Sequence, residues 1–229
     1  MSDGGESGAA DGSGDASAEE WPVEFRGITE SLVTTLGPND LWNVAALGLH
    51  PPAESEGVEA VGEAAGGSDG KRDDGDDPRV TARTWGNTRT RRNFHRQGGG
   101  YVQFVRDPVD FVDATLSIFE VEEPVLDSAA AWVEVETERV DSGEEGDTEW
   151  EKWTLSPIES GVERETVPTI NRGVGAVVEA TVAASRLGVE TYDDAQLRER
   201  LSYFEAVGRN CGDDRVHTAL DRLRDHLDE

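Results

Sequence analysis

The sequence predicts an α+β fold in which an antiparallel β-barrel or sandwich precedes a small unit of three helices. Two observations support this class. As far as residue 160, about six short apolar runs are separated mostly by loops, and full crossover helices of the kind a doubly wound sheet needs are missing. From residue 171 onward, apolar residues recur at helical spacing in three successive segments.

The first strands follow from apolar runs bounded by turn residues. Residues 23–50 predict two strands joined by a turn at Gly37-Pro38-Asn39-Asp40. The run at 41–49 is too short and too interrupted by glycine for an independent helix, so it is interpreted as a buried strand. Residues 80–85 and 101–105 predict two more strands, the latter with clear alternation of apolar and polar positions.

The segment between those two strands has few apolar positions. It predicts a loop and a short helix with Thr88 or Asn87 as its N-cap. Gly98-Gly99-Gly100 ends this helix and is interpreted as a flexible exit.

The second half of the predicted barrel is marked less clearly. Residues 109–119 predict a short amphipathic helix. Two strands are expected at 129–135 and 150–155, with an acidic loop at 141–148 between them.

The C-terminal segment predicts three helices, the second and third of which are capped. One begins after Asn171, and the other two begin at the acidic pairs Asp193-Asp194 and Asp213-Asp214. Aspartates at these positions accept hydrogen bonds from free amides of the first turn, so they are interpreted as structural.

Composition sets the domain boundaries. Residues 1–20 have almost no large apolar side chain and are expected to form a disordered acidic tail. Residues 52–78 are a second acidic, low-complexity stretch, expected to be a solvated insertion loop within the barrel. The barrel is therefore expected over 21–160 and the helical domain over 161–229.

The chain is strongly acidic, with a formal net charge of −28. A phosphate backbone would be repelled by most of this surface, so nucleic acid is not expected as a partner. Lys71 and Lys152 are the only lysines, against 19 arginines. This usage resembles that of halophilic archaea, whose proteins work in molar salt, where charges are screened beyond ~3 Å. An ordinary acidic protein is the alternative.

The compartment is expected to be the cytoplasm. The sequence has no apolar run long enough to span a membrane and no signal pattern at its start. Cys211 is the only cysteine, which excludes an intramolecular disulfide. The four histidines have no Cys or carboxylate neighbours at ligand spacing, so no metal site is predicted.

Residues 79–106 are the main candidate for function. This stretch contains seven arginines and no Asp or Glu, in a chain with 49 acidic residues. Such segregation builds a local positive field suited to an anion. The residues between the arginines add hydroxyl and amide groups that can hold a phosphate. The alternative is that these arginines merely offset acidic residues elsewhere on the surface.

Four motifs, in this order, resemble a known family. They are NVAALG at 43–48, RTWGNTRTRRNF at 83–94, VRDPVDFV at 105–112 and INRGVGAVVEATVAASRL at 170–187. The order resembles the FMN-binding split β-barrel superfamily, which includes flavin reductase-like proteins. The match is closer to an archaeal family in which this barrel carries a helical C-terminal domain. The resemblance extends over about residues 23–228, interrupted by the acidic insertion.

The resemblance implies a split β-barrel and a homodimer with FMN bound near the subunit interface. It places one group of residues along the isoalloxazine and ribityl part, a second at the ribityl or phosphate, and arginines against the phosphate charge. Trp85 would stack near the ring or else belong to the core. The first group is Thr34, Thr35, Asn43, Val44, Ala45 and Ala46; the second is Thr84, Asn87, Thr88, Thr90 and Asn93; the arginines are Arg89, Arg91 and Arg92.

The expected function is that of an FMN-binding flavoprotein, acting by hydride or electron transfer at the ring. The cofactor itself supplies such chemistry, so no catalytic side chain is assigned. The alternative is a non-enzymatic module that binds another phosphorylated ligand or a partner protein through the arginine segment. RNA binding is the weakest interpretation, because the acidic surface opposes it.

Overall fold

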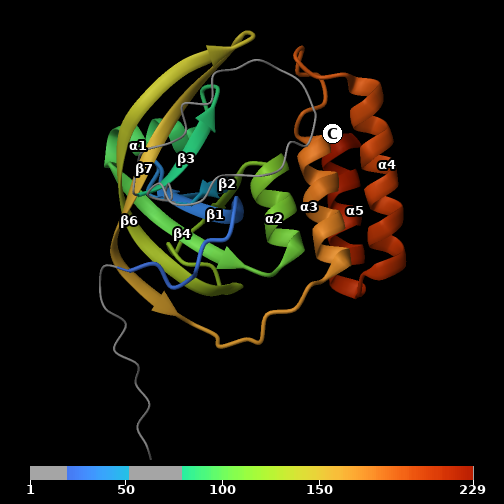
Figure 1. The fold of residues 1–229 in the computed structure, drawn as a ribbon, viewed down its shortest axis with the longest axis horizontal. Helices are drawn as coiled ribbons and strands as arrows, with labels where there is room; N and C mark the ends of the chain where they lie inside the picture. The colour runs from blue at the N-terminus through green and yellow to red at the C-terminus, as the bar shows by residue number, and fades with distance from the viewer. Residues whose placement is uncertain (1–19, 52–78, 229) are drawn as a thin grey trace, which may run out of the picture.

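The computed structural model describes residues 20–51 and 79–228. Within them the protein is an α+β fold, an antiparallel split β-barrel followed by C-terminal helices (Figure 1). The expectations for the tail at 1–20 and the insertion at 52–78 concern segments that lie, apart from residue 20, outside the described residues. None of the helices in the described ranges is long and apolar enough to cross a membrane.

Six strands close the barrel in the order β1-β4-β6-β7-β3-β2, and β1 pairs again with β2. All of these pairings are antiparallel. The interior is filled by apolar side chains at alternating positions of the strands, together with Phe94. The strands are β1 Thr29–Leu36, β2 Trp42–His50, β3 Val80–Trp85, β4 Gly99–Val105, β6 Ala129–Glu145 and β7 Thr148–Val162.

The barrel is split between β2 and β3. These strands pair only at two positions, Leu49 with Ala82 and His50 with Thr81. Beyond them the strands separate, and the short strand β5, Phe119–Val121, pairs with the other end of β2. Among the described strands, none pairs with residues 45–48 along this edge of β2. A stretch of strand edge is therefore open.

Helix α1, Arg89–Gln97, packs over the barrel through Phe94, which is buried against Trp153 at 5.2 Å between ring centroids. Thr88 is its N-cap, one of the two caps predicted, and Gly98 ends it in the left-handed conformation. The prediction of a flexible exit over all three glycines was wrong, because Gly99 and Gly100 begin β4. A Cβ on either residue would collide with a backbone carbonyl oxygen, so tight strand packing requires glycine at both positions.

The predicted acidic loop at 141–148 was also wrong. Strands β6 and β7 run through it and pair as far as Glu145 with Thr148, leaving only a two-residue turn. Gly146 in this turn has a φ of +59°. Both faces of the hairpin tip are largely exposed, so the tip shows no apolar alternation that would identify a strand.

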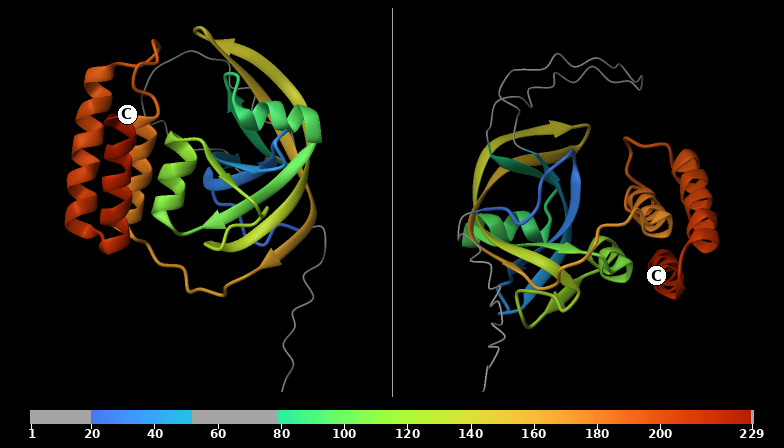
Figure 2. Two further views of the ribbon diagram at one scale, coloured as in Figure 1. Left: turned by 180° about the vertical axis from the view of Figure 1, so that it is seen from behind. Right: turned by 60° about the horizontal axis from the view of Figure 1, so that its bottom comes forward.

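Four helices form a second layer beside the barrel, and Figure 2 shows α2 between the barrel and the other three. They are α2 Pro108–Leu116, α3 Arg172–Ala184, α4 Asp194–Cys211 and α5 Asp214–Asp228. The predicted caps Asp193 and Asp213 accept hydrogen bonds from first-turn amides, and Asn171, which was not predicted as a cap, does the same for α3.

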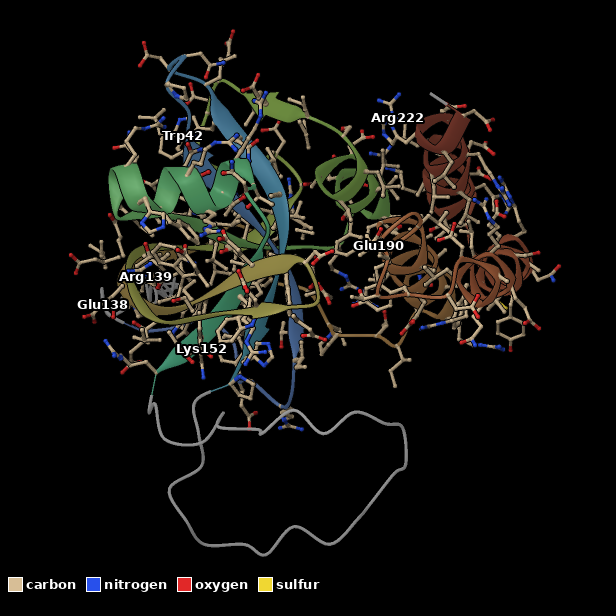
Figure 3. The ribbon with its side chains drawn as sticks, turned by 90° about the horizontal axis from the view of Figure 1, so that it is seen from above. Trp42, Glu138, Arg139, Lys152, Glu190 and Arg222 are labelled. Carbon is tan, nitrogen blue, oxygen red and sulfur yellow. The ribbon has the colours of Figure 1, made fainter. Side chains whose placement is uncertain are left out.

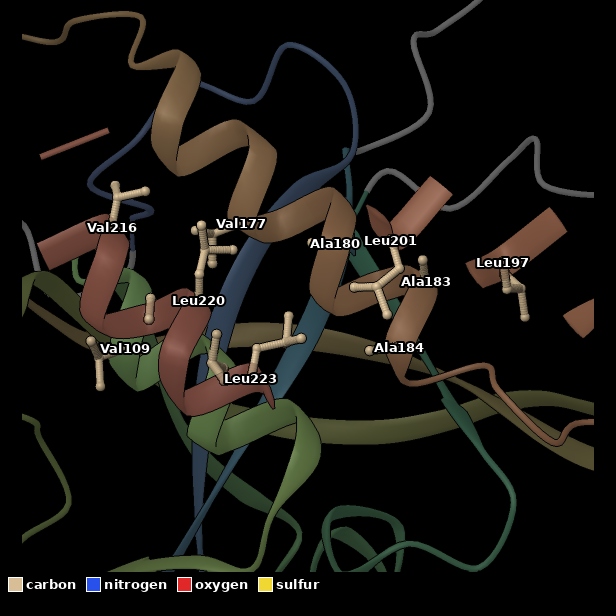
Figure 4. Close-up of a cluster of buried hydrophobic side chains, with 12 residues drawn as sticks. Val109, Val177, Ala180, Ala183, Ala184, Leu197, Leu201, Val216, Leu220 and Leu223 are labelled. Atoms are coloured by element: carbon tan, nitrogen blue, oxygen red, sulfur yellow. The ribbon is translucent and has the colours of Figure 1, made fainter. Parts of the chain in front are cut away.

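The helices share one buried cluster, to which α2 contributes Val109 and Val112 (Figure 4). On its other side, α2 packs Phe111 and Ala114 against Leu32 and Val44 of the barrel. Helix α2 therefore joins the core of the barrel to the core of the C-terminal helices.

Candidate functional site

A pocket of about 550 Å³ lies where β2 and β3 separate. The two strands supply two of its sides, the N-terminus of α1 supplies one end, and the ends of α2 and α3 supply a further wall. The residues that line it are Asn43, Val44, Ala45, Ala46, Leu47, Arg83, Thr84, Trp85, Asn87, Thr88, Arg89, Thr90, Arg92, Ala114, Thr115, Ile118 and Ser185.

The β2 side of the pocket is formed by the edge of the strand. Five consecutive residues, 43–47, contact the pocket. Successive side chains of a strand point to opposite faces, so a cavity that touches all five must touch the strand edge. Among the described residues no strand pairs with residues 45–48 along this edge, so its outward backbone groups make no strand hydrogen bonds; the Leu47 carbonyl oxygen accepts from the Ser31 hydroxyl at 2.7 Å.

One end of the pocket is positive. The first turn of α1 contains no acidic residue, and Thr88 caps it by accepting a hydrogen bond from the Arg91 amide at 3.3 Å. Amides at a helix N-terminus carry partial positive charge. Arg89 and Arg92 are three residues apart, and both line the pocket. Among the described residues that line the pocket there is no Asp or Glu, although the chain has 49 of them.

The two arginines differ in their contacts. Arg89 Nη1 lies 2.6 Å from Glu120 Oε1 on β5. Arg92 Nη1 instead donates to the carbonyl oxygen and the Oδ1 of Asn87, at 2.6 and 3.1 Å. Arg89 therefore already has a carboxylate partner, whereas the contacts of Arg92 hold the turn before α1.

The β3 side presents alternating faces. Thr84 points inward and accepts a hydrogen bond from Trp153 Nε1 at 3.0 Å. Arg83 and Trp85 lie on the outer face, and Trp85 is 42% exposed. The Arg83 guanidinium lies over the ring of Trp150, 4.6 Å from its centroid, which fixes its position at the pocket.

The remaining wall comes from the helices, at Ala114, Thr115, Ile118 and Ser185. Helix α2 is held by α5 through an ion pair and a histidine–carboxylate contact. Asp113 of α2 contacts His226 at 2.7 Å and Arg222 at 3.0 Å, and Arg222 is labelled on α5 in Figure 3. The C-terminal helices therefore help to fix this wall.

Eleven of the residues predicted from the sequence line this pocket, and four do not. Thr34 is buried and donates to Pro124 O at 2.5 Å. Thr35 is buried and accepts a hydrogen bond from Asn93 Nδ2 at 2.9 Å. Arg91 is directed toward Glu149 and Glu151 of β7. The eleven lining residues are Asn43, Val44, Ala45, Ala46, Thr84, Trp85, Asn87, Thr88, Arg89, Thr90 and Arg92.

Sequence reasoning did not assign Arg83 or the helical wall to the site. Arg83 could have been found, because it lies within the arginine segment on the same strand face as Trp85. Thr115, Ile118 and Ser185 carry no local signal, since only tertiary packing brings them to the split.

Two family models match the chain. The model of the N-terminal domain of DUF447, a protein family of unknown function, matches residues 71–164, and the DUF447 C-terminal model matches residues 171–225. Together they span more than half of the sequence. The chain belongs to the DUF447 family. No curated protein matches this DUF447 chain.

Among solved structures, an FMN-bound DUF447 protein from Methanosarcina mazei has the same fold. It is 23% identical, with a TM-score of 0.65 over 87% of this chain and 95% of its own. The flavin reductase of styrene monooxygenase from Pseudomonas putida matches 62% of this chain and 83% of its own, at 12% identity and a TM-score of 0.34. A flavoredoxin from Methanosarcina acetivorans matches 66% of this chain and 79% of its own, at 14% identity and a TM-score of 0.35.

Proposed function

We propose that this DUF447 protein is a flavoprotein that binds FMN in the split of the barrel. The observation that carries the proposal is a pocket whose described lining contains three arginines and no carboxylate, in a chain of net charge −28. Its volume of about 550 Å³ is within the range of sites for small molecules and cofactors. A solved member of the same family is described as FMN-bound, which supports the same ligand here.

The phosphate of FMN belongs at the N-terminus of α1. Thr88 and Thr90 line this end of the pocket and carry amides and hydroxyls that can donate to a phosphate, and Arg89 and Arg92 add two charges. Arg92 would bind the phosphate while it keeps the turn in place through Asn87. Arg89 would divide its charge between the phosphate and Glu120.

The isoalloxazine ring belongs along β2, toward the helical wall. Val44, Ala46 and Leu47 supply apolar surface, and the open edge of β2 supplies backbone donors and acceptors for the polar rim of the ring. Trp85 and Ile118 are exposed apolar residues that line the pocket, and a ring bound beside them would be partly shielded from water.

Bound FMN would supply hydride or electron transfer, so we propose that the protein is a flavin-dependent oxidoreductase. The role of the chain is to hold the cofactor, to orient its ring against the strand edge and to shield it from solvent. Holding, orienting and shielding the cofactor requires no side chain of the pocket to give or take a proton.

We further propose that the protein works as a homodimer in a cytoplasm of high salt. Val162, Val167 and Ile170 are exposed apolar side chains at the end of β7 and in the segment before α3. A second copy that covers them would remove this surface from water. Light scattering with size-exclusion chromatography in molar KCl tests the dimer, and a monomer at micromolar concentration would contradict it.

The test of FMN binding is an absorbance spectrum of the protein purified in molar KCl, followed by titration of the apoprotein with FMN and riboflavin. We expect a flavin spectrum, stoichiometric FMN and much weaker binding of riboflavin. A colourless protein that takes up neither flavin would refute the proposal. The pocket would then have to be screened against other phosphorylated ligands.

A further inference from the structure

A buried carboxylate lies behind the N-terminus of α1. Glu151 of β7 has a side chain that is only 2% exposed, and two arginines and a histidine contact it. Arg91 of α1 binds both of its oxygens, at 3.0 and 3.1 Å. His95 of α1 lies 2.8 Å away and Arg139 of β6 lies 3.1 Å away. In Figure 3, Arg139 lies on the β6–β7 hairpin beside α1.

The carboxylate is held in its charged form. Burial acts to raise the pKa of Glu151, but hydrogen bonds from Arg91, His95 and Arg139 outweigh it and lower the pKa below its ordinary value. A buried ion pair of this kind adds little net stability compared with apolar packing. Stability alone therefore does not require this cluster, because apolar side chains of similar volume would stabilise the fold as well.

Arg91 connects this carboxylate to the turn that precedes α1. Its Nη1 donates to the carbonyl oxygen of Gly86 at 3.2 Å and to Glu149 at 3.0 Å. The Gly86 amide in turn donates to the carbonyl oxygen of Glu149 at 2.7 Å. Gly86 has a φ of +64°, which a side chain would disfavour. The start of the turn is therefore held against β7 by the side chain of Arg91 and by one backbone hydrogen bond from Gly86 to Glu149.

The helix separates two kinds of arginine. Arg89 and Arg92 line the pocket, whereas Arg91 is directed toward β7. The residues that follow Gly86 in the turn, Asn87 and Thr88, are pocket residues. Whatever fixes Gly86 therefore fixes the donors at the positive end of the pocket.

We propose that Glu151 and Arg91 are positioning residues, which hold the turn at 86–88 and the N-terminus of α1 in the geometry that binds the phosphate of the ligand. The inference rests on the proposed function. Neither side chain lines the pocket, so both act through the turn.

Charge alone and positioning make opposite predictions for Glu151→Gln. This change removes a negative charge near an anion site, so through-space electrostatics predicts tighter binding of FMN. Loss of the anchor for Arg91 loosens the turn and predicts weaker binding. Arg91→Lys is a second test. It keeps the positive charge, but a lysine ammonium cannot bind Glu151 and Gly86 with the planar fork of a guanidinium.

The experiment is titration of the folded apoproteins with FMN and with riboflavin, at one KCl concentration. We expect E151Q and R91K to lose at least about tenfold in affinity for FMN, the effect of one charge-assisted hydrogen bond, with riboflavin unchanged. Amide hydrogen exchange in the ligand-free proteins should be faster at residues 86–90. This second measurement does not depend on flavin.

Two variants serve as matched controls. Glu149→Gln removes the second carboxylate that binds Arg91; the Glu149 side chain is 61% exposed. Arg139→Gln removes a positive charge that contacts Glu151 and leaves the contacts of the turn in place. Both are expected to keep the preference for FMN.

Unchanged or tighter FMN binding in E151Q, or unchanged exchange at 86–90, would overturn the positioning role while the proposed function stands. A wild-type protein that binds FMN and riboflavin equally would instead refute the phosphate site itself.

Discussion

Arg92→Ala is the most direct test of the phosphate end of the pocket. Arg92 lines the pocket, and its hydrogen bonds go to the carbonyl oxygen and Oδ1 of Asn87. Arg89 lies on the same side of α1 but is paired with Glu120 at 2.6 Å. A phosphate must compete with Glu120 for Arg89, whereas in the described part of the chain no carboxylate lies within ion-pair distance of Arg92.

The expected magnitudes follow from this difference. A hydrogen bond to a charged group contributes about 1.5–3 kcal/mol, so Arg92→Ala should lower FMN affinity by about 2 kcal/mol, or roughly 30-fold. Arg89→Ala also leaves Glu120 without its ion-pair partner, close to the anion. The phosphate loses less in this variant, because Arg89 is already paired with Glu120. We expect a smaller loss there, about fivefold, since partly exposed pairs contribute about 1 kcal/mol or less.

The assay is fluorescence quenching of free flavin on titration with each variant, with riboflavin as the ligand that lacks a phosphate. Arg200→Ala is the control, because it removes an exposed cation of α4 that pairs with Glu179 and does not line the pocket. Equal losses for FMN and riboflavin would show that Arg92 supports the fold and not the phosphate. A larger loss for Arg89→Ala than for Arg92→Ala would contradict the assigned order.

Three further outcomes are expected. Glu120→Gln should tighten FMN binding about two- to fivefold by releasing Arg89, as measured by the same titration; weaker binding would count against the competition. Because the pKa of Glu151 is lowered in the folded protein, its stabilising contribution is present above the unfolded value of about 4.3 and is lost as pH falls through the folded value. The free energy of unfolding, measured with urea, should therefore fall less between pH 5 and pH 3 in E151Q than in the wild type. Equal dependence of this free energy on pH in the two proteins would contradict the reasoning. Gly100→Ala should destabilise the barrel by about 1–3 kcal/mol, since the new Cβ collides with the carbonyl oxygen of Thr34; an unchanged urea midpoint would refute that contact.

Much of the fold could be predicted because most strands of the barrel are short apolar runs bounded by turn residues. Residues 80–85 were predicted with the bounds that β3 has, and β4 differs only by the two glycines at its start. The prediction of strands failed where a strand has few apolar residues or is very short. The tip of the β6–β7 hairpin is charged on both faces, and β5 is only three residues long.

The site could be predicted in part for a similar reason. The strand edge at 43–46 and the segment at 84–92 are each continuous in sequence, so a local motif indicates them. The helical wall at Ile118 and Ser185 depends on how α2 and α3 pack against the barrel, which no local pattern specifies. The direction of Arg91 is set by Glu151, sixty residues away along the chain.

The open edge of β2 has a consequence for how this pocket can change over evolution. A ligand that is bound through main-chain amides and carbonyls does not depend on which side chains the strand carries. Residues 44–47 can therefore drift among small and apolar types while the hydrogen-bonding pattern they offer stays the same. Distant chains could keep one ligand with no shared side-chain signature along this strand, and what must be inherited is the gap between β2 and β3.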